Sequence, residues 1–204
     1  DIQNRIIGTN AHVLAFPANT KEGIKNYQEL VNKIEKIDHV TGAAPYFMGQ
    51  VMLKFSDKID GILLWGVIPE SISKVNKLSK NIIKGDINSI TKKLPGNEDG
   101  IIIGKELSQS SAIDIGDDVV IVSPVFKQTP SGPMPKMVKM KVVGIFNAGM
   151  YDYDSTFAYV SLNTAQELFE KGDIATGIAI NADNIENAGY IATEIHRKFK
   201  NLWA

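Results

Sequence analysis

The stretch of sequence that most constrains the fold is residues 119–146, VVIVSPVFKQTPSGPMPKMVKMKVVGIF. It opens with four β-branched residues, 119–122, and closes with a run in which apolar residues alternate with lysines over 138–142. Side chains in a strand point to opposite faces in turn, so the second run has one apolar and one basic face. The pattern predicts an antiparallel strand pair with one buried face.

The connection between these strands, roughly residues 126–137, is about twice as long as ordinary hairpin loops of about 2–5 residues. Pro130, Pro133 and Pro135 lie within it. Each proline lacks a backbone N–H, fixes its own φ and favours extended geometry in the residue before it. We therefore expect a stiff, extended tip that cannot pair as a central strand.

We call residues 126–137 the arm, and two interpretations of it remain open. A projection that is already stiff loses little conformational entropy when a protein docks on it. Met134 and Met137 would add adaptable apolar contacts for such a partner. In the alternative interpretation, the arm is a solvated loop whose prolines only protect a sheet edge.

The composition narrows the class of protein. With 204 residues, 44% of them hydrophobic, the chain suits one large domain or two small ones. Its 22 basic and 23 acidic residues nearly balance, so nothing favours electrostatic capture of nucleic acid or of an anionic membrane. The absence of cysteine excludes disulfides, thiolate chemistry and cysteine-based zinc sites.

The two ends of the chain suggest an excised segment. It starts with Asp1 rather than Met and ends without a helix-stop signal, so we expect it to be part of a longer protein. No apolar run approaches the roughly 20 residues that span a bilayer. Any membrane segments are expected outside it.

Periodicity predicts mixed secondary structure. A strand over 11–16 and an amphipathic helix over 26–37 read as the first half of a βαβ unit, and a β-hairpin over 40–67 follows, with its turn at 56–58. A strand over 174–181 and a helix over 187–199 close the chain and resemble the opening pair. This similarity suggests that both ends pack in one α/β layer.

We therefore predict an α+β fold of two subdomains. Residues 1–90 and 173–204 would form the α/β subdomain, with the boundary in a polar stretch rich in turn signals. Residues 91–172 would form an inserted β-rich subdomain that carries the arm as a long projecting hairpin.

The motifs of common enzymes are missing. The sequence contains no GxSxG, GxGxxG or GxxxxGK[ST] pattern, and no HExxH motif accompanies His12, His39 or His196. We expect no metal and no cofactor. An interaction domain is favoured over an enzyme.

The best paired carboxylates are Asp152 and Asp154. On a strand or turn both would point to one side, where they could bind a cation or act as acid and base. The plainer interpretation, which we favour, is that the aspartates cap backbone donors in a turn while Tyr151 and Tyr153 pack.

Several short motifs, taken in order, carry a resemblance to a known family. They are GTNAHV (8–13), LWGVIPE (64–70), IGKEL (103–107), GDDV (116–119), TPSGPMP (129–135), VGIF (143–146) and GMYDYD (149–154). In order and spacing the chain resembles, over nearly its whole length, the large periplasmic domain of lipoprotein-releasing ABC transporter permeases of the LolC/LolE type.

This resemblance implies a periplasmic domain of an inner-membrane protein in a Gram-negative bacterium, with an α/β porter subdomain and a β-rich sabre subdomain as in MacB-like permeases. It implies a non-catalytic role, since in the family separate cytoplasmic subunits hydrolyse ATP. The implied partners are those ATPase subunits, a second permease copy, the outer-membrane lipoproteins that are transported and the soluble carrier LolA.

The resemblance also assigns a site. LolC-type permeases capture LolA with a projecting hook that enters the hydrophobic cavity of the carrier, and the arm falls where that hook should lie. The expected partner-binding residues are Thr129, Pro130, Ser131, Gly132, Pro133, Met134, Pro135, Lys136 and Met137.

Two alternatives are kept. In the first, the chain is the periplasmic domain of a MacB-like efflux or mechanotransmission permease that docks on an adaptor protein, with binding at the subdomain tips and a dispensable arm. In the second, it is a small hydrolase or metal enzyme that uses Asp152, Asp154 and a histidine.

Overall fold

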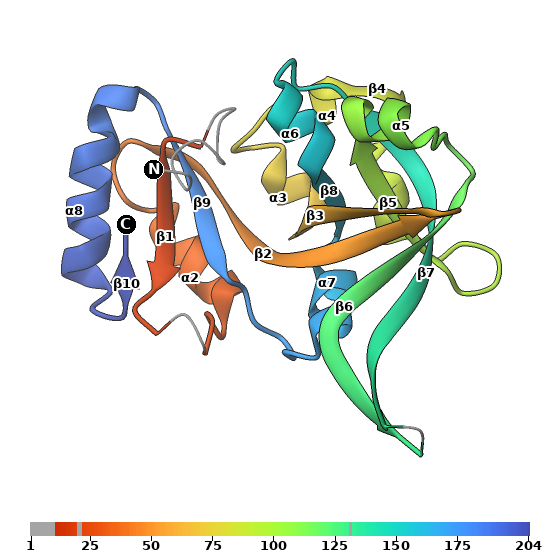
Figure 1. The fold of residues 1–204 in the computed structure, drawn as a ribbon. Helices are drawn as coiled ribbons and strands as arrows, with labels where there is room; N and C mark the ends of the chain where they lie inside the picture. The colour runs from red at the N-terminus through yellow and green to blue at the C-terminus, as the bar shows by residue number, and fades with distance from the viewer. Residues whose placement is uncertain (1–10, 20–21, 131) are drawn as a thin grey trace. The chain divides into compact units, whose positions relative to one another are not determined.

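The computed structural model describes residues 11–19, 22–130 and 132–204 (Figure 1). The fold is mixed α+β with one large mixed sheet. The chain divides into two compact units: the first comprises 1–47, 67–78 and 173–204, and the second comprises 48–66 and 79–172. The long strand β2 (Val40–Phe55) contributes residues to both units.

The first unit is a small sheet with helices. Its elements are β1 (Val13–Pro17), α2 (Tyr27–Ile34), the first half of β2, α3 (Pro69–Ile72), β9 (Gly177–Ala182), η2 (Ile185–Asn187), α8 (Ala188–Lys198) and β10 (Leu202–Trp203). The strand order is β10-β1-β9-β2, and each of the neighbouring pairs is antiparallel.

The predicted βαβ unit is wrong in one respect. A simple βαβ unit would place β1 and β2 side by side, but β9 lies between them and pairs with both. The sheet therefore uses a split β-α-β arrangement, and β9, α8 and β10 repeat it around β1, which is the ferredoxin-like order. The sequence around β1 does not predict this strand order, because β9, which pairs with β1, lies near the other end of the chain.

The core of this unit lies between its sheet and its helices. Val31 and Ile34 of α2 and Ile191 and Ile195 of α8 are buried together with strand residues such as Ile180. These helical positions are spaced three and four residues apart, which gives each helix one apolar stripe. Figure 1 shows α8 running alongside β1 and β10.

The second unit holds the remaining elements. They are the second half of β2, β3 (Lys58–Val67), α4 (Leu78–Asn81), β4 (Ile82–Gly85), η1 (Ile87–Thr91), β5 (Asp99–Gly104), α5 (Lys105–Ser111), β6 (Asp118–Thr129), β7 (Gly132–Phe146), α6 (Tyr151–Thr156), β8 (Phe157–Ser161) and α7 (Leu162–Phe169). The hydrogen-bonded order is β2-β3-β8-β5-β7-β4, and β6 pairs with both β2 and β7. Because β6 joins these two strands, six strands form a closed ring.

The subdomain boundaries drawn from the sequence differ from these units. The sequence places residues 48–66 and 79–90 in the α/β subdomain formed by the chain ends, whereas in the structure they belong to the second unit. The reason is strand pairing: Met52 of β2 pairs with Val122 of β6, and Ile82 of β4 is aligned with Phe146 of β7.

The predicted antiparallel pair with one buried face is confirmed by β6 and β7. Met140 and Val142 are fully buried, whereas Lys139 and Lys141 are on the other face and form ion pairs with Asp118. The predicted turn between β2 and β3 is also confirmed, since the strands end and resume on either side of residues 56–57.

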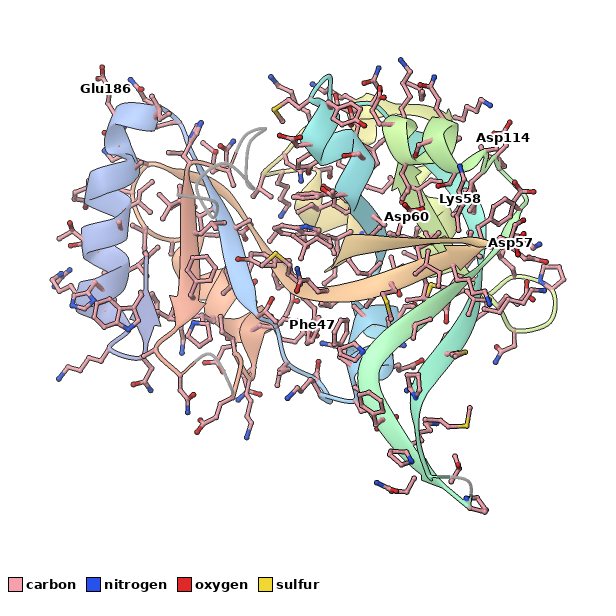
Figure 2. All side chains as sticks on the ribbon, viewed as in Figure 1. Phe47, Asp57, Lys58, Asp60, Asp114 and Glu186 are labelled. Atoms are coloured by element: carbon pink, nitrogen blue, oxygen red, sulfur yellow. The ribbon has the colours of Figure 1, made fainter. Side chains whose placement is uncertain are left out.

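Polar contacts attach this turn to α5. Lys58 donates a hydrogen bond to the carbonyl of Ser110, and Ser111 donates one of 2.8 Å to Asp60. Lys58 and Asp60 are labelled in Figure 2. None of the helices in the described ranges is long and apolar enough to span a membrane.

Candidate partner-binding arm

The arm is a strand ribbon rather than a long loop, so the predicted loop over 126–137 is wrong. Phe126, Lys127, Gln128 and Thr129 of β6 pair with residues 135, 134, 133 and 132 of β7. Only residues 130–131 separate the two strands. In Figure 1 the ribbon projects beyond the other elements of its unit.

The prolines permit this pairing because of their spacing. Pro133 and Pro135 lie two residues apart on β7, so they occupy the same kind of position in an antiparallel ladder, in which hydrogen-bonded and non-hydrogen-bonded pairs alternate. At non-hydrogen-bonded positions the backbone N–H points away from the partner strand, so its absence costs no ladder bond. Residues 132–135 pair with β6 alone among the described strands, so the tip is not a central strand, as expected. The predicted loop was wrong because the prolines still allow pairing on one edge.

The arm exposes large apolar side chains. Phe126, Met134 and Met137 are 63%, 49% and 57% exposed. Phe126 shares its face of the ribbon with its cross-strand partner Pro135, and Met134 lies on the opposite face beside Lys127. The tip thus presents apolar surface on both faces.

The predicted site residues occupy different places on this ribbon. Thr129 and Gly132 close it, with the Thr129 hydroxyl donating a hydrogen bond of 2.7 Å to the Gly132 carbonyl and with Gly132 at φ 109°. Pro130 is exposed, and Ser131 lies outside the described residues.

Lys136 differs from the rest of the predicted set. Its ammonium is 3.0 Å from a carboxylate oxygen of Glu170, and the side chain is only 17% exposed. Phe126 lies in the arm and is exposed, but it is not among the site residues expected from the sequence. An aromatic residue between two predicted strands, flanked by polar residues and prolines, was the available signal.

The paired carboxylates do not form a site. Asp152 and Asp154 lie on α6, where a spacing of two residues turns side chains to nearly opposite sides. Asp154 is buried and accepts hydrogen bonds from the backbone N–H groups of Ala148 and Gly149, at 2.7 and 3.0 Å. The predicted capping role is therefore confirmed for Asp154, whereas Asp152 is exposed.

The tyrosines of this segment also differ from each other. Tyr153 packs at 4.1 Å from the ring of Phe157 and shares a hydrogen bond with the hydroxyl of Tyr159. Burial raises the pKa of Tyr159 well above its ordinary value. Tyr151, which was also expected to pack, is 70% exposed.

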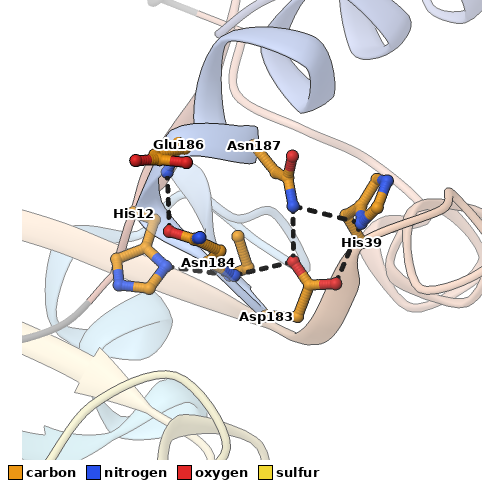
Figure 3. Close-up of polar contacts among 7 residues, drawn as sticks. His12, His39, Asp183, Asn184, Glu186 and Asn187 are labelled. Carbon is orange, nitrogen blue, oxygen red and sulfur yellow. Dashed lines mark hydrogen bonds and ion pairs between the residues drawn. The ribbon is translucent and has the colours of Figure 1, made fainter.

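Each of the three histidines contacts a different part of the first unit. His12 accepts a hydrogen bond of 3.1 Å from the N–H of Ala182, and His39 lies 2.9 Å from a carboxylate oxygen of Asp183 (Figure 3). His196 stacks loosely on Trp203. In the part of the chain that the structure describes, no three potential metal ligands converge.

Comparison with curated proteins finds relatives along most of the chain. The lipoprotein-releasing system transmembrane protein LolC of Xylella fastidiosa (strain Temecula1) is 27% identical over 195 residues, which cover 96% of this chain and 45% of that protein. LolC of Neisseria meningitidis serogroup B is 24% identical over 189 residues, covering 92% and 44%. LolE of Haemophilus influenzae is 20% identical over 188 residues, covering 90% and 44%.

Solved structures show the same fold. The extracellular domain of the ABC-type transporter YknZ from Gram-positive bacteria matches with a TM-score of 0.60 at 14% identity, covering 94% of this chain and 97% of that one. The periplasmic region of MacB from Actinobacillus actinomycetemcomitans matches with a TM-score of 0.55 at 10% identity, covering 93% and 86%. No family model matches the chain.

The chain thus spans a little less than half the length of these LolC and LolE relatives, which are transmembrane proteins of the lipoprotein-releasing system. The chain is therefore a domain related to the LolC and LolE permeases, with the fold of the MacB and YknZ domains.

Proposed function

We propose that this chain is the periplasmic domain of the inner-membrane permease of a lipoprotein-releasing ABC transporter. In this proposal it is non-catalytic and captures a LolA-like lipoprotein carrier through the arm, so that lipoproteins are handed over for sorting to the outer membrane. ATPase subunits and a second permease copy would join through parts of the permease beyond this chain. The first unit would be the porter subdomain, and the second the sabre subdomain.

The observation that carries the proposal is the exposure of apolar side chains on a stiff ribbon. Phe126, Met134 and Met137 are each about half exposed or more. Clustered exposed apolar side chains are typical of surfaces that bind other proteins. A ribbon that is already paired loses little entropy on binding, so more of the contact energy appears as affinity.

The residues of the arm divide by role. The proposed contacts with the carrier come from Thr129 to Pro135, with Met137 and with Phe126 in addition. Methionine adapts its shape to an apolar cavity, and the prolines keep the strands extended. Lys136 remains in the proposed set, but its engaged side chain suits it to hold the arm rather than to reach into the partner.

Calorimetric titration with the lipoprotein carrier of the same organism tests the proposal. The double variant Pro133→Gly, Met134→Ala should bind about tenfold more weakly or worse, because truncated hot-spot residues typically cost roughly 1 to 4 kcal/mol. Ile185→Ala serves as a control, since Ile185 is 67% exposed but belongs to the first unit.

The same titration separates the proposal from its alternative. If the unaltered domain does not bind the carrier, or if the double variant binds as well as the unaltered domain, the arm is not a capture element. The domain would then be assigned to a MacB-like permease that docks an adaptor protein through its subdomain tips.

A further inference from the structure

The ladder between β6 and β7 is interrupted at the base of the arm. Val122 pairs with Met137, and the next pair along the ladder is Phe126 with Pro135, so residues 123–125 of β6 face a single residue of β7. Such bulges bend a ribbon and leave residues unpaired. Beyond the interruption the arm has four cross-strand pairs, and an isolated two-stranded ribbon is only marginally stable in water. Left to the ladder alone, the arm would bend here.

At the interruption of the ladder, β6 and β7 each contact α7. The Ser123 hydroxyl donates a hydrogen bond of 3.0 Å to the carbonyl of Leu168 and accepts one of 3.2 Å from the N–H of Val125. From the facing strand, the Lys136 ammonium donates to the carbonyl of Glu167 at 2.6 Å. We call Ser123 and Lys136 the bracing pair.

These contacts are favourable because of where they fall on the helix. Leu168 and Glu167 belong to the last turn of α7, where carbonyls lack the i+4 N–H partners of the helix interior. The Glu167 carbonyl also accepts a long hydrogen bond of 3.3 Å from the N–H of Glu170, so Lys136 is its second donor. A lysine near a helix C-terminus also interacts favourably with the helix dipole. Ser123 is 2% exposed, so its hydrogen bonds compete little with water.

Helix α7 is itself held firmly in the second unit. Its N-terminal Ser161 accepts a hydrogen bond of 3.1 Å from the N–H of Thr164, whose hydroxyl donates to Asp99 at 3.0 Å. At the other end, Phe169 packs so closely on Gly49 that a Cβ there would lie 2.2 Å from the ring. The bracing pair therefore attaches the arm to α7 at the point where the β6–β7 ladder is interrupted.

We propose that Ser123 and Lys136 are positioning residues that set the direction of the arm by bracing it on the C-terminal turn of α7. Neither side chain needs to touch the carrier for carrier binding to depend on it. The bracing itself is independent of the proposed function, and only its effect on carrier binding rests on that function.

Spin-label distance measurements on the domain alone test the bracing. The chain has no cysteine, so labels can be placed through Gln128→Cys on the arm and Gln109→Cys on α5, both exposed and both in the second unit. Lys136→Met combined with Ser123→Ala should broaden the distance distribution. Lys92→Met, an exposed lysine outside the arm, should leave it unchanged, and Lys136→Arg should keep it narrow.

A distribution that stays equally narrow without the bracing pair would overturn the proposal, whether or not the carrier binds. Lys136→Met alone provides a second measurement if the double variant folds poorly, because Lys136 lies nearer the surface. In carrier titration, the variant that combines Ser123→Ala with Lys136→Met should lose about three- to tenfold in affinity. Broadening with unchanged carrier affinity would overturn the positioning role while leaving the bracing geometry intact.

Discussion

Phe126 and Pro135 are cross-strand partners on one face of the arm, and the Phe126 side chain remains 63% exposed there. An aromatic ring next to a proline presents rigid apolar area with few rotatable bonds. Such area binds a partner with little loss of side-chain entropy. Phe126 thus extends the candidate site beyond the residues expected from the sequence, which already included Pro135.

Replacing Phe126 should therefore impair binding but not folding. We expect Phe126→Ala to weaken carrier binding by about tenfold, a loss of roughly 1.4 kcal/mol, while the urea midpoint stays within error of the unaltered domain. Calorimetric titration and urea unfolding on the same preparations check both parts. Equal affinity of Phe126→Ala and the unaltered domain would remove this residue from the site.

Gly104 leaves room for the backbone of α6. A Cβ at this position would lie 2.1 Å from the carbonyl oxygen of Asp154, whereas a Cβ at Gly61 would meet nothing within 4 Å. Overpacking of this kind typically costs about 1–3 kcal/mol. We expect Gly104→Ala to lower the free energy of unfolding by that amount and Gly61→Ala to change it little, as measured by urea unfolding.

Asp154 and Asp152 form a matched pair for testing the capping role. Asp154→Ala should lower the free energy of unfolding by about 1–3 kcal/mol, because the part-buried N–H of Ala148 loses its acceptor and the N–H of Gly149 keeps only Asn147. Asp152→Ala should have almost no effect, since Asp152 is exposed on the same helix. Equal losses for both variants in thermal or urea unfolding would contradict the capping role.

Local features of the fold could be predicted from the sequence, and long-range ones could not. The alternation over 138–142 and the helix cap at Ser161 were predictable because neighbours in sequence determine them. The position of β9 between β1 and β2 depends on pairing between the two ends of the chain, which no local pattern encodes.

The arm shows a different limit. Its prolines predict a stiff segment, but whether Pro133 and Pro135 allow pairing with β6 depends on their phase in the ladder, which only the register reveals. The bracing by Lys136 was equally hidden, because its partners on α7 lie about thirty residues further along the chain. The candidate site was thus predictable as a segment but not in its geometry.

The ion pairs that Asp118 forms with Lys139 and Lys141 of β7 should make the stability of the domain depend on pH. Hydrogen bonds from Lys139 and then from Lys141 lower the pKa of the Asp118 carboxyl. A group whose pKa is lowered by folding stabilises the folded state above its unfolded pKa, and this contribution is lost as the pH falls through the folded value. The ion pairs should therefore stabilise the domain near neutrality and fade in acid.

Asp118→Asn should accordingly lower the urea midpoint near pH 7, and this difference from the unaltered domain should shrink at an acid pH below the folded-state pKa of Asp118, where the carboxylate is protonated in both states. Added salt should also reduce it, because exposed ion pairs are screened. Asp57→Asn makes the same change of charge at an exposed turn and should show neither trend. If the Asp118→Asn difference is the same at both pH values, the stabilisation does not come from the charge of Asp118, and packing of the side chain would have to account for it.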